Sequence, residues 1–290
     1  MTEITLSNGV KMPSVLLGTY RTRGPAAVEL SVKSALESGY LGIDTAAVYR
    51  NHKDIAGTLA KTLPGLNLSR RDIFLTSKLS PQDHGTEKCK DGILKCLDEL
   101  ETDYLDLFLI HWPGVQKLQL DDPQNKLLRA ESWRVLEDFY KSGKLRSIGV
   151  SNYTVQHLEH LMEHCTVVPH VNQVELHPHY PQDDLVKFCS THSIHLQAYS
   201  SLGQNGVSGK LLSSKSVLEI ASNIDKTPAQ VLLKWGVLRG FSVLPKSTNP
   251  EHIKLNLNLD FHISDLDMTT LNNLHCTEFE KYAWDPANII

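Results

Sequence analysis

The feature that most constrains the fold is a regular alternation of short apolar runs with longer segments of helical periodicity. Leucine and alanine recur at spacings of three and four in residues 26–38, 130–141 and 217–224, which is typical of helices that pack on one face. Strands separated by such helices pair in parallel, because a parallel crossover needs about a dozen residues or more. The eight apolar runs that predict strands lie at residues 15–17, 41–43, 73–76, 105–110, 146–150, 171–174, 194–198 and 241–244.

Eight strand–helix units in 290 residues predict an α/β protein of the (β/α)8 TIM-barrel class, which typically takes about 250 residues. The alternative, a doubly wound sheet, favours a Gly-x-Gly-x-x-Gly turn after its first strand, and the sequence there, LLGTYRTRG, does not fit. Asn8 and Gly9 lie between alternating apolar residues, which predicts a β-hairpin that closes the bottom of the barrel. We interpret residues 1–290 as a single domain.

Composition narrows the classes of function. A net charge of −4 and a pI near 6.4, without a basic stripe, argue against a nucleic-acid partner. The sequence has no apolar stretch of membrane-spanning length and no secretory-signal layout at its start, so we expect a cytoplasmic protein without a membrane partner. The five scattered cysteines predict free thiols. His177 and His179 are the nearest candidate metal pair, but Pro178 separates them and no third ligand is evident, so no metal is expected.

Polar side chains follow three neighbouring strands of the predicted barrel. Asp44 and Tyr49 come after the second apolar run, Lys78 after the third, and His111 with Trp112 after the fourth. Because barrel active sites lie at the C-terminal ends of the strands, these side chains are expected to meet at one face. Taken singly, each has an ordinary interpretation as a turn residue, a surface charge or a core aromatic. Their coincidence at strand ends favours an active site.

The combination has a chemical logic. A phenol has an unperturbed pKa of about 10, and we expect the ammonium of Lys78 to lower the pKa of Tyr49 and make it a better proton donor. Asp44 would keep Lys78 charged and oriented. His111 would orient a carbonyl oxygen or share in the proton transfer. Such a site is suited to reducing a carbonyl group, with the hydride supplied by a cofactor.

A polar, cationic loop follows the last apolar run. Residues 245–249 read Pro-Lys-Ser-Thr-Asn, and the sequence from Asn249 to Glu251 marks the start of a helix. A loop of this kind at a strand end is suited to holding a phosphate group.

Together these motifs resemble the aldo-keto reductase family, in particular its short-loop members similar to aldose reductase and 2,5-diketogluconate reductase. The resemblance rests on GIDTAAVYRN, LTSKL, LFLIHWP, SIGVSNY, VNQVELHP, AYSSLG and LPKSTNPEH, and it runs from the hairpin to nearly the last residue. It implies a barrel that binds NADPH across its mouth and reduces aldehydes and ketones to alcohols. It also implies a catalytic tetrad of Asp44, Tyr49, Lys78 and His111, with Tyr49 as the general acid.

The resemblance further implies a set of cofactor-binding residues. They comprise the backbone after the first strand, the polar groups near the nicotinamide amide, the aromatic ring under the nicotinamide, the loop along the pyrophosphate and the phosphate loop. The expected residues are Gly18, Thr19, Tyr20, Asp44, Ser151, Asn152, Gln173, Tyr199, Ser200, Leu202, Gln204, Lys246, Ser247, Thr248, Asn249, His252 and Asn256.

One position departs from the family pattern in a way that bears on the cofactor. The family has an arginine five residues after the loop serine, where it contacts adenine and the 2′-phosphate, and this chain has His252 there. An arginine binds phosphate bidentately and keeps its charge, whereas a histidine is largely neutral near pH 7. Lys246 remains, and no acidic side chain is evident for a ribose 2′-hydroxyl. We expect NADPH to be preferred by a narrowed margin, with NADH tolerated.

The expected substrate-binding residues surround the predicted mouth. Fewer large rings than in mammalian relatives predict a roomy or polar mouth, and Trp284 in the C-terminal segment is a further candidate for its wall. Small aldehydes, dicarbonyls and quinones all remain open as substrates. The expected residues are Tyr20, Val48, Tyr49, Ser80, His111 and Trp112.

A second class of function stays open at this level. Barrels of this type also serve as non-catalytic cofactor-binding, regulatory or structural proteins, because a fold does not by itself prove catalysis. The complete set of four polar residues favours the enzyme. A monomer is expected.

Overall fold

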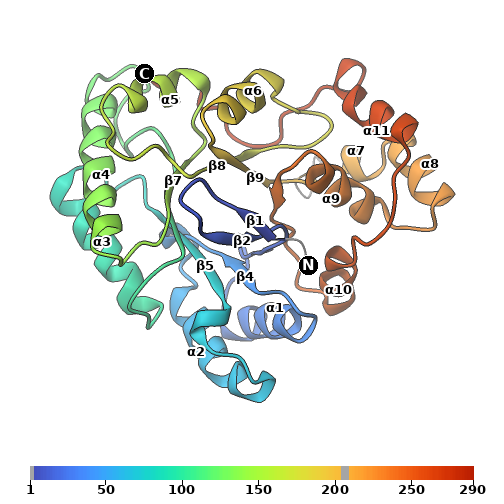
Figure 1. Ribbon diagram of the computed structural model, residues 1–290, viewed down its shortest axis with the longest axis horizontal. Coiled ribbons are helices and arrows are strands. Elements are labelled where there is room, and N and C mark those ends of the chain that lie inside the picture. The colour runs from blue at the N-terminus through green and yellow to red at the C-terminus, as the bar shows by residue number, and fades with distance from the viewer. Residues whose placement is uncertain (1–2, 204–208) are drawn as a thin grey trace.

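A curled sheet of parallel strands lies at the centre of the computed structural model, which describes residues 3–203 and 209–290 (Figure 1). Its strands are β3 (Leu17–Gly18), β4 (Gly42–Asp44), β5 (Phe74–Leu79), β6 (Leu107–Ile110), β7 (Ile148–Ser151), β8 (Val171–Glu175), β9 (His195–Tyr199) and β10 (Ser242–Val243). In the described residues, these eight strands pair in parallel in chain order. The predicted α/β class is therefore confirmed.

Backbone contacts between the outer strands close the sheet into a barrel. Val15 forms a parallel bridge with Val243. The Leu16 N–H donates to the Val243 carbonyl oxygen at 3.0 Å, and the Val243 N–H donates to the Ser14 carbonyl oxygen at 2.8 Å. All strand C-termini consequently face one end, which we call the mouth; the opposite end is the base.

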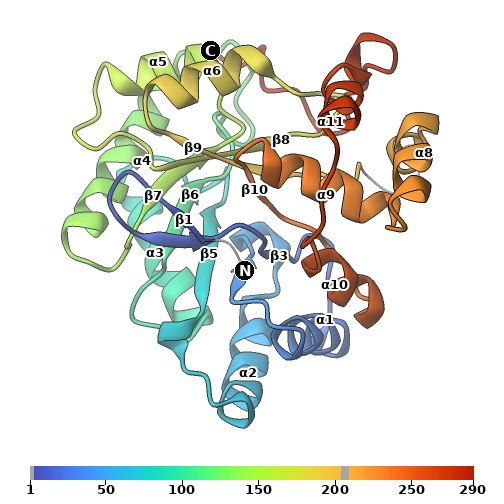
Figure 2. The ribbon, with the colours of Figure 1, turned by 45° about the vertical axis from the view of Figure 1, so that its right-hand side comes forward.

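Helices surround the barrel on its outer face (Figures 1 and 2). The α-helices are α1 (Pro25–Glu37), α2 (His52–Thr62), α3 (Thr86–Glu99), α4 (Gln124–Lys141), α5 (Val155–Met162), α6 (Asp183–Thr191), α7 (Gly209–Leu212), α8 (Lys215–Asn223), α9 (Pro228–Leu238), α10 (Pro250–Leu257) and α11 (Asp265–Asn272). The 3-10 helices are η1 (Ala47–Tyr49), η2 (Pro64–Leu66), η3 (Arg70–Asp72) and η4 (Leu274–Cys276). Among the helices of the described ranges, none has the length and apolar character that crossing a lipid bilayer requires.

Helix α4 begins six residues before the predicted segment 130–141. The added turns contain polar residues that look solvent-facing in the sequence but are buried here. Asn125 accepts a hydrogen bond from the Val115 N–H at 2.9 Å, and Arg129 donates to the Ile290 carbonyl oxygen at 2.6 Å. Periodicity of apolar residues alone cannot reveal a helix face that is buried through polar contacts.

The predicted hairpin is confirmed at the base. Strands β1 (Glu3–Thr5) and β2 (Lys11–Pro13) pair antiparallel, and the turn between them contains Gly9 with φ 84°. Asn8 donates to the Arg146 carbonyl oxygen at 3.0 Å, just before β7 begins. Leu6 and Met12 are buried in an interior cluster with Leu16, Phe74, Leu107, Leu109, Val171 and Leu244.

The base also holds a cluster of charges. Asp106, just before β6, accepts hydrogen bonds from Arg70 at 2.9 Å and from Arg146 at 3.3 Å. Both guanidinium groups lie over the Tyr104 ring, at 4.3 and 4.1 Å from its centroid. Asp106 Oδ2 also accepts a hydrogen bond from the Leu75 N–H at 3.0 Å, which ties β5 to the segment just before β6.

Candidate active site

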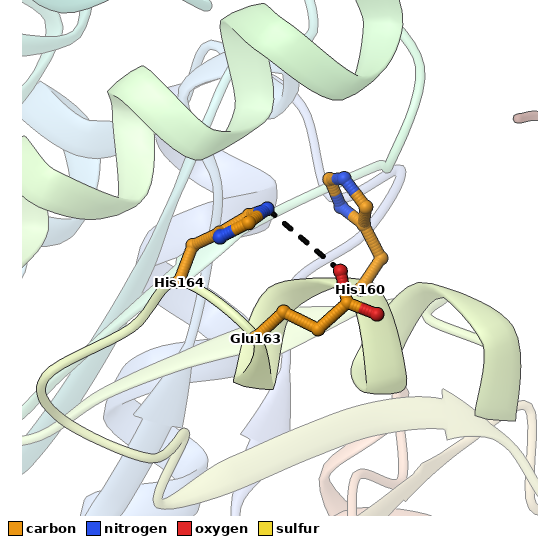
Figure 3. A group of neighbouring side chains, drawn as sticks. All are labelled: His160, Glu163 and His164. Atoms are coloured by element: carbon orange, nitrogen blue, oxygen red, sulfur yellow. Dashed lines mark ion pairs between the residues drawn. The ribbon is translucent and has the colours of Figure 1, made fainter.

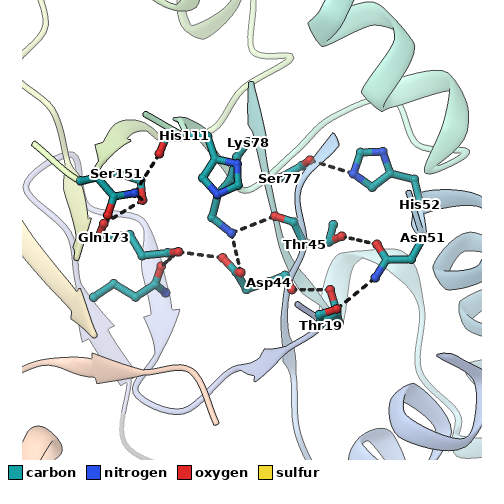
Figure 4. Close-up of polar contacts among 12 residues, drawn as sticks. Thr19, Asp44, Thr45, Asn51, His52, Ser77, Lys78, His111, Ser151 and Gln173 are labelled. Atoms are coloured by element: carbon teal, nitrogen blue, oxygen red, sulfur yellow. Dashed lines mark hydrogen bonds and ion pairs between the residues drawn. The ribbon is translucent and has the colours of Figure 1, made fainter. Parts of the chain in front are cut away.

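A buried ion pair between neighbouring strands lies at the centre of the mouth (Figure 4). Asp44 ends β4, and Lys78 in β5 donates to Asp44 Oδ1 at 2.5 Å and to the Thr45 carbonyl oxygen at 2.9 Å. The Lys78 side chain is fully buried. Burial lowers the pKa of Lys78, and the adjacent Asp44 carboxylate opposes that shift. The arrangement keeps two charges paired where an unpaired one would be costly.

The second oxygen of Asp44 is held from the opposite side of the barrel. Gln173 in β8 donates its amide to Asp44 Oδ2 at 2.7 Å and to Gln197 Oε1 at 2.6 Å. Strands β4 and β8 are four places apart in the sheet order, so these side chains span the interior. Sequence reasoning missed Gln197. An amide side chain within a run that predicts a buried strand was the signal that could have revealed it.

Tyr49 ends the short helix η1 that follows β4, and its ring lies over the ion pair. Lys78 Nζ is 5.2 Å from the ring centroid, and the ring of His111 is edge-on at 5.7 Å. Burial, followed by the Asp44 carboxylate, raises the pKa of Tyr49 well above its ordinary value. The expectation that Lys78 lowers this pKa is wrong for the structure. Burial and the Asp44 carboxylate both disfavour the phenolate and set the direction of the shift.

His111 follows β6 and is neutral near pH 7. Burial, with a smaller contribution from Lys78, lowers the pKa of His111 to about 3. Its Nδ1 is buried and has no hydrogen-bond partner among the described residues. A neutral imidazole has one nitrogen that donates a hydrogen bond and one that accepts.

Ser151, Asn152 and Tyr199 form a chain of hydrogen bonds beside His111. Asn152 donates to the His111 carbonyl oxygen at 2.9 Å and accepts from the Tyr199 hydroxyl at 2.6 Å. Ser151 donates to the Gln173 carbonyl oxygen at 2.8 Å. Asn152 has φ 64°, a left-handed conformation that asparagine tolerates better than most residues. The structure thus places Ser151 and Asn152, which were expected near the nicotinamide amide, beside Tyr199, which was expected under the nicotinamide ring.

A polar network supports the segment that carries Tyr49. Thr45 donates to Asn51 Oδ1 at 2.6 Å, and Asn51 donates to the Thr19 carbonyl oxygen at 3.2 Å (Figure 4). The Thr19 hydroxyl donates to the Asp44 carbonyl oxygen at 2.8 Å. These contacts connect the ends of β3 and β4 to the start of α2, so η1 is held from both sides.

The cationic loop lies at the end of β10 and leads into α10, as predicted. Asn249 caps the helix, because its Oδ1 accepts from the backbone N–H groups of Glu251 at 2.9 Å and His252 at 3.4 Å. Ser31 of α1 donates to the Ser247 carbonyl oxygen at 2.7 Å and fixes the loop against its neighbour. Lys246 and His252 are exposed.

The remaining expected cofactor residues that the structure describes lie in different environments. Gly18 approaches the β10 loop closely, since a Cβ there would lie 3.0 Å from the Leu244 carbonyl oxygen. Asn256 is buried, and Ser200 and Leu202 are half-buried. Gln204 lies outside the described residues.

The expected substrate side chains do not share one environment. Tyr20 and Val48 are exposed, and the Tyr20 ring lies 5.2 Å from that of Tyr49. Trp112 contacts Trp284 edge-on with ring centroids 6.4 Å apart. Ser80 is buried in a turn instead, where its hydroxyl accepts from the Gln82 N–H at 3.4 Å.

One group of possible metal ligands lies in the outer layer of helices. His160, Glu163 and His164, at the end of α5, place one ligand atom each within 4.8 Å of one another (Figure 3). Burial, then Arg129 and Lys126, lowers the pKa of His160. The same two cations oppose the binding of a metal ion, so this group is a poor cation site. The pair considered in the sequence is engaged differently, His177 by Glu175 and His179 by Tyr282 and Glu278.

Comparison with known proteins gives a consistent result over nearly the whole chain. The profile of the aldo/keto reductase family matches residues 15–275. Glyoxal reductase of Bacillus subtilis is 38% identical over 276 residues, which cover 95% of this chain and 93% of that protein. Aldose reductase B of Dictyostelium discoideum is 38% identical, with 91% of this chain and 89% of that protein covered.

Solved structures agree with these sequence matches. An aldo-keto reductase enzyme from a Medee basin deep-sea metagenome library superposes with a TM-score of 0.88 at 35% identity, covering 99% of both chains. The aldose reductase from Schistosoma japonicum superposes with a TM-score of 0.86 at 35% identity, covering 97% of this chain and 94% of that one. The chain therefore belongs to the aldo/keto reductase family, whose enzymes are oxidoreductases that reduce carbonyl compounds with NAD(P)H.

Proposed function

We propose that this chain reduces aldehydes and ketones to alcohols with NADPH, and that Tyr49 is the general acid. The observation that carries the proposal is the fully buried Lys78–Asp44 pair directly beside the Tyr49 ring and a neutral His111. Each of these groups can play a distinct chemical role, and the four lie together at the mouth. When bound, the cofactor supplies the hydride.

In this proposal each of the four side chains has its own part in the transfer of a proton to the carbonyl oxygen. Tyr49 keeps its proton near neutral pH, because its pKa is raised, and donates it to the carbonyl oxygen. The His111 ring, which lies edge-on to that of Tyr49, orients that oxygen through a hydrogen bond. Lys78 stabilises the phenolate that remains, since an ammonium lies 5.2 Å from the ring centroid. Asp44 holds Lys78 in place.

The residues present fit a nicotinamide dinucleotide phosphate. The Tyr199 ring is fixed by its hydrogen bond to Asn152 and offers a flat surface at the mouth. Lys246 is an exposed cation on a loop that Ser31 and Asn249 hold in place, and it is suited to a 2′-phosphate. These features support NADPH as the preferred cofactor, with His252 in place of the family's arginine narrowing the preference over NADH.

The variant Tyr49→Phe tests the catalytic assignment. It removes only the hydroxyl, so turnover is expected to fall by a factor on the order of 10² to 10⁴, the range for general acid–base catalysis. The dissociation constant for NADPH, measured by tryptophan fluorescence quenching, should stay unchanged. Retained turnover in Tyr49→Phe would reject this role for Tyr49.

The same titration on the wild type tests the cofactor assignment. NADPH is expected to bind more tightly than NADH, because Lys246 can pair with the 2′-phosphate of NADPH. NADH has a neutral 2′-hydroxyl at that position. Equal or tighter binding of NADH would contradict the proposal.

Three further properties stay predictions for the chain: one domain over residues 1–290, a monomer, and a cytoplasmic location. Light scattering coupled to gel filtration measures the second directly, and a mass of about twice 32.5 kDa would contradict it.

A further inference from the structure

Glu175, the last residue of β8, is a buried carboxylate whose donors come largely from the C-terminal segment. Among the described residues, its side chain accepts hydrogen bonds from Lys281 Nζ at 2.9 Å and from the backbone N–H groups of Tyr282 at 2.5 Å and Ala283 at 3.0 Å. His177 Nε2 completes the set at 3.0 Å. Burial would raise the pKa of Glu175, but His177 and Lys281 outweigh it and lower the pKa to about 2.

The segment held by Glu175 leads directly to the substrate side of the mouth. Lys281 Nζ, besides pairing with Glu175, donates to the Trp284 carbonyl oxygen at 3.0 Å. The Trp284 ring packs edge-on against Trp112, the residue that follows His111. His84 in turn contacts the Trp112 carbonyl oxygen at 3.0 Å. A continuous set of contacts therefore joins the carboxylate of Glu175 to the ring of the residue that follows His111.

The position of Trp284 depends on this backbone anchor. Its side chain is 80% exposed, so burial does not hold it. Other side-chain contacts of the C-terminal segment are the pair of Glu280 with Lys210 at 2.7 Å and the contacts of Glu278 and Tyr282 with His179 at 3.2 and 2.8 Å. The Lys210–Glu280 pair is largely exposed, whereas Glu175 and Lys281 are 1% and 17% exposed. Exposed pairs contribute little rigidity.

We propose that Glu175 is a positioning residue that sets substrate specificity: it fixes residues 281–284 so that Trp284 and Trp112 form one aromatic wall of the mouth, for carbonyl substrates with an aromatic ring. The inference rests on the proposed function, since it takes the carbonyl to react beside His111. Two indole rings at a right angle offer apolar area and an edge-to-face partner for a third ring. A two-carbon dicarbonyl has no ring to pack against this wall.

The variant Glu175→Gln tests the inference with two substrates, 4-nitrobenzaldehyde and glyoxal. We expect KM for 4-nitrobenzaldehyde to rise by about five- to ten-fold, as for the loss of one good aromatic contact, with kcat within about two-fold. Both constants for glyoxal should stay within about two-fold. A purely structural role would change thermal stability without separating the two substrates. An equal effect on both substrates, or none on either, would overturn the inference.

Two further variants secure the result. Trp284→Ala should reproduce the KM effect, and the double variant Glu175→Gln with Trp284→Ala should add nothing to it, because both remove the same wall. Additive effects would count against the inference. If Glu175→Gln does not fold, Lys281→Met takes its place with the same expectation. Lys210→Met, which breaks the exposed pair of the same segment, is the matched control and should leave both substrates unaffected.

A readout without turnover separates this inference from the proposed function. Trypsin cleavage after Lys281, followed by mass spectrometry, should accelerate at least several-fold in Glu175→Gln, because the bond to Tyr282 is released from its anchor. If the wild type reduces neither aldehyde, the proposed function fails while the cleavage result still reports on the anchor. An unchanged cleavage rate would show that Glu175 does not hold the segment and would overturn the inference.

Discussion

The two ends of the barrel each contain a buried carboxylate bound to basic side chains from neighbouring chain segments, yet the two sites differ in what surrounds them. At the mouth, Asp44 binds one fully buried lysine and one glutamine. At the base, Asp106 binds Arg70 and Arg146, whose side chains are 23% and 46% exposed. The base charges reach water, whereas the mouth charges depend on each other.

This difference explains why similar chemistry serves two purposes. Guanidinium groups are fixed forks that stack on Tyr104 and bind the carboxylate at the same time, which suits a permanent tie between strands. A lysine is a single point charge whose pKa shifts readily on burial, which suits a site where a proton moves. The comparison predicts that damage at the mouth lowers turnover, whereas damage at the base lowers stability and leaves turnover unchanged.

The largest expected effect comes from Lys78→Met. We expect kcat to fall by a factor on the order of 10² to 10⁴, because the cation beside the Tyr49 ring is lost. The variant should also be less stable by about 3 kcal/mol, since Asp44 is left buried without its partner. Steady-state kinetics and urea unfolding measure the two effects separately.

A double variant separates the two effects of Lys78→Met. Adding Asp44→Asn removes the uncompensated charge and should restore most of the stability, while turnover stays lost. If turnover returned with stability, the loss in Lys78→Met would come from misfolding, and the proposed role of Lys78 would be wrong.

At the base, Asp106→Asn is expected to lower the free energy of unfolding by about 3 kcal/mol. This is the low end of the range for a broken buried pair, because Arg146 remains hydrated. The ratio kcat/KM per folded molecule should stay unchanged at temperatures where the variant is folded. A loss of kcat/KM comparable to that of Lys78→Met would break the contrast between the two ends.

The sequence predicts which residues lie at the mouth where these residues follow the C-terminal ends of parallel strands. Strand C-termini share one end, so Asp44, Lys78 and His111 could be expected together, and the structure brings them together. It does not predict contacts across the barrel. Gln173 reaches Asp44 over 129 positions, and Lys281 reaches Glu175 over 106. Such pairs depend on the register of the strands and on the course of the C-terminal segment, and no local sequence pattern predicts either.

The direction of the Tyr49 pKa shift shows the same limit. A lysine near a phenol in the sequence suggests a lowered pKa, but the outcome depends on burial and on a carboxylate that is closer to the lysine than the phenol is. Both are properties of the packed interior. The four-residue site could therefore be predicted, and its electrostatics could not.

Two histidines, one at each end of the barrel, extend the comparison to pH. His111 at the mouth has a pKa of about 3 and His195 at the base a pKa of about 4, both lowered chiefly by burial. For a histidine whose folded pKa is below the unfolded value of about 6.5, the unfolded state takes up protons first, so stability falls as pH drops below about 6.5. For His195 alone this amounts to about 2 kcal/mol between pH 7.5 and pH 5.

The variant His195→Gln should remove that part of the pH dependence. Its free energy of unfolding, measured in urea, should fall less between pH 7.5 and pH 5 than that of the wild type. The protonation state of His111 at the mouth is measured by kinetics instead. The pH profile of kcat/KM should show no ionisation from His111 between pH 5 and pH 8, because His111 is neutral over that range. A kinetic pKa near 6.5 that disappears in His111→Asn would contradict this assignment.

The smallest expected effects come from two residues in the left-handed conformation, one at each end. Gly9→Ala in the base hairpin should cost about 1 kcal/mol, because an alanine at φ 84° is strained although its Cβ meets nothing within 4 Å. Its kcat/KM should match that of the wild type. Asn152→Gly at the mouth keeps the left-handed backbone but loses the contacts to His111 and Tyr199, so it should weaken NADPH binding more than it lowers stability. The reverse pattern, with the hairpin variant altering cofactor binding, would mean that the base and the mouth are coupled through the barrel and that their division of roles does not hold.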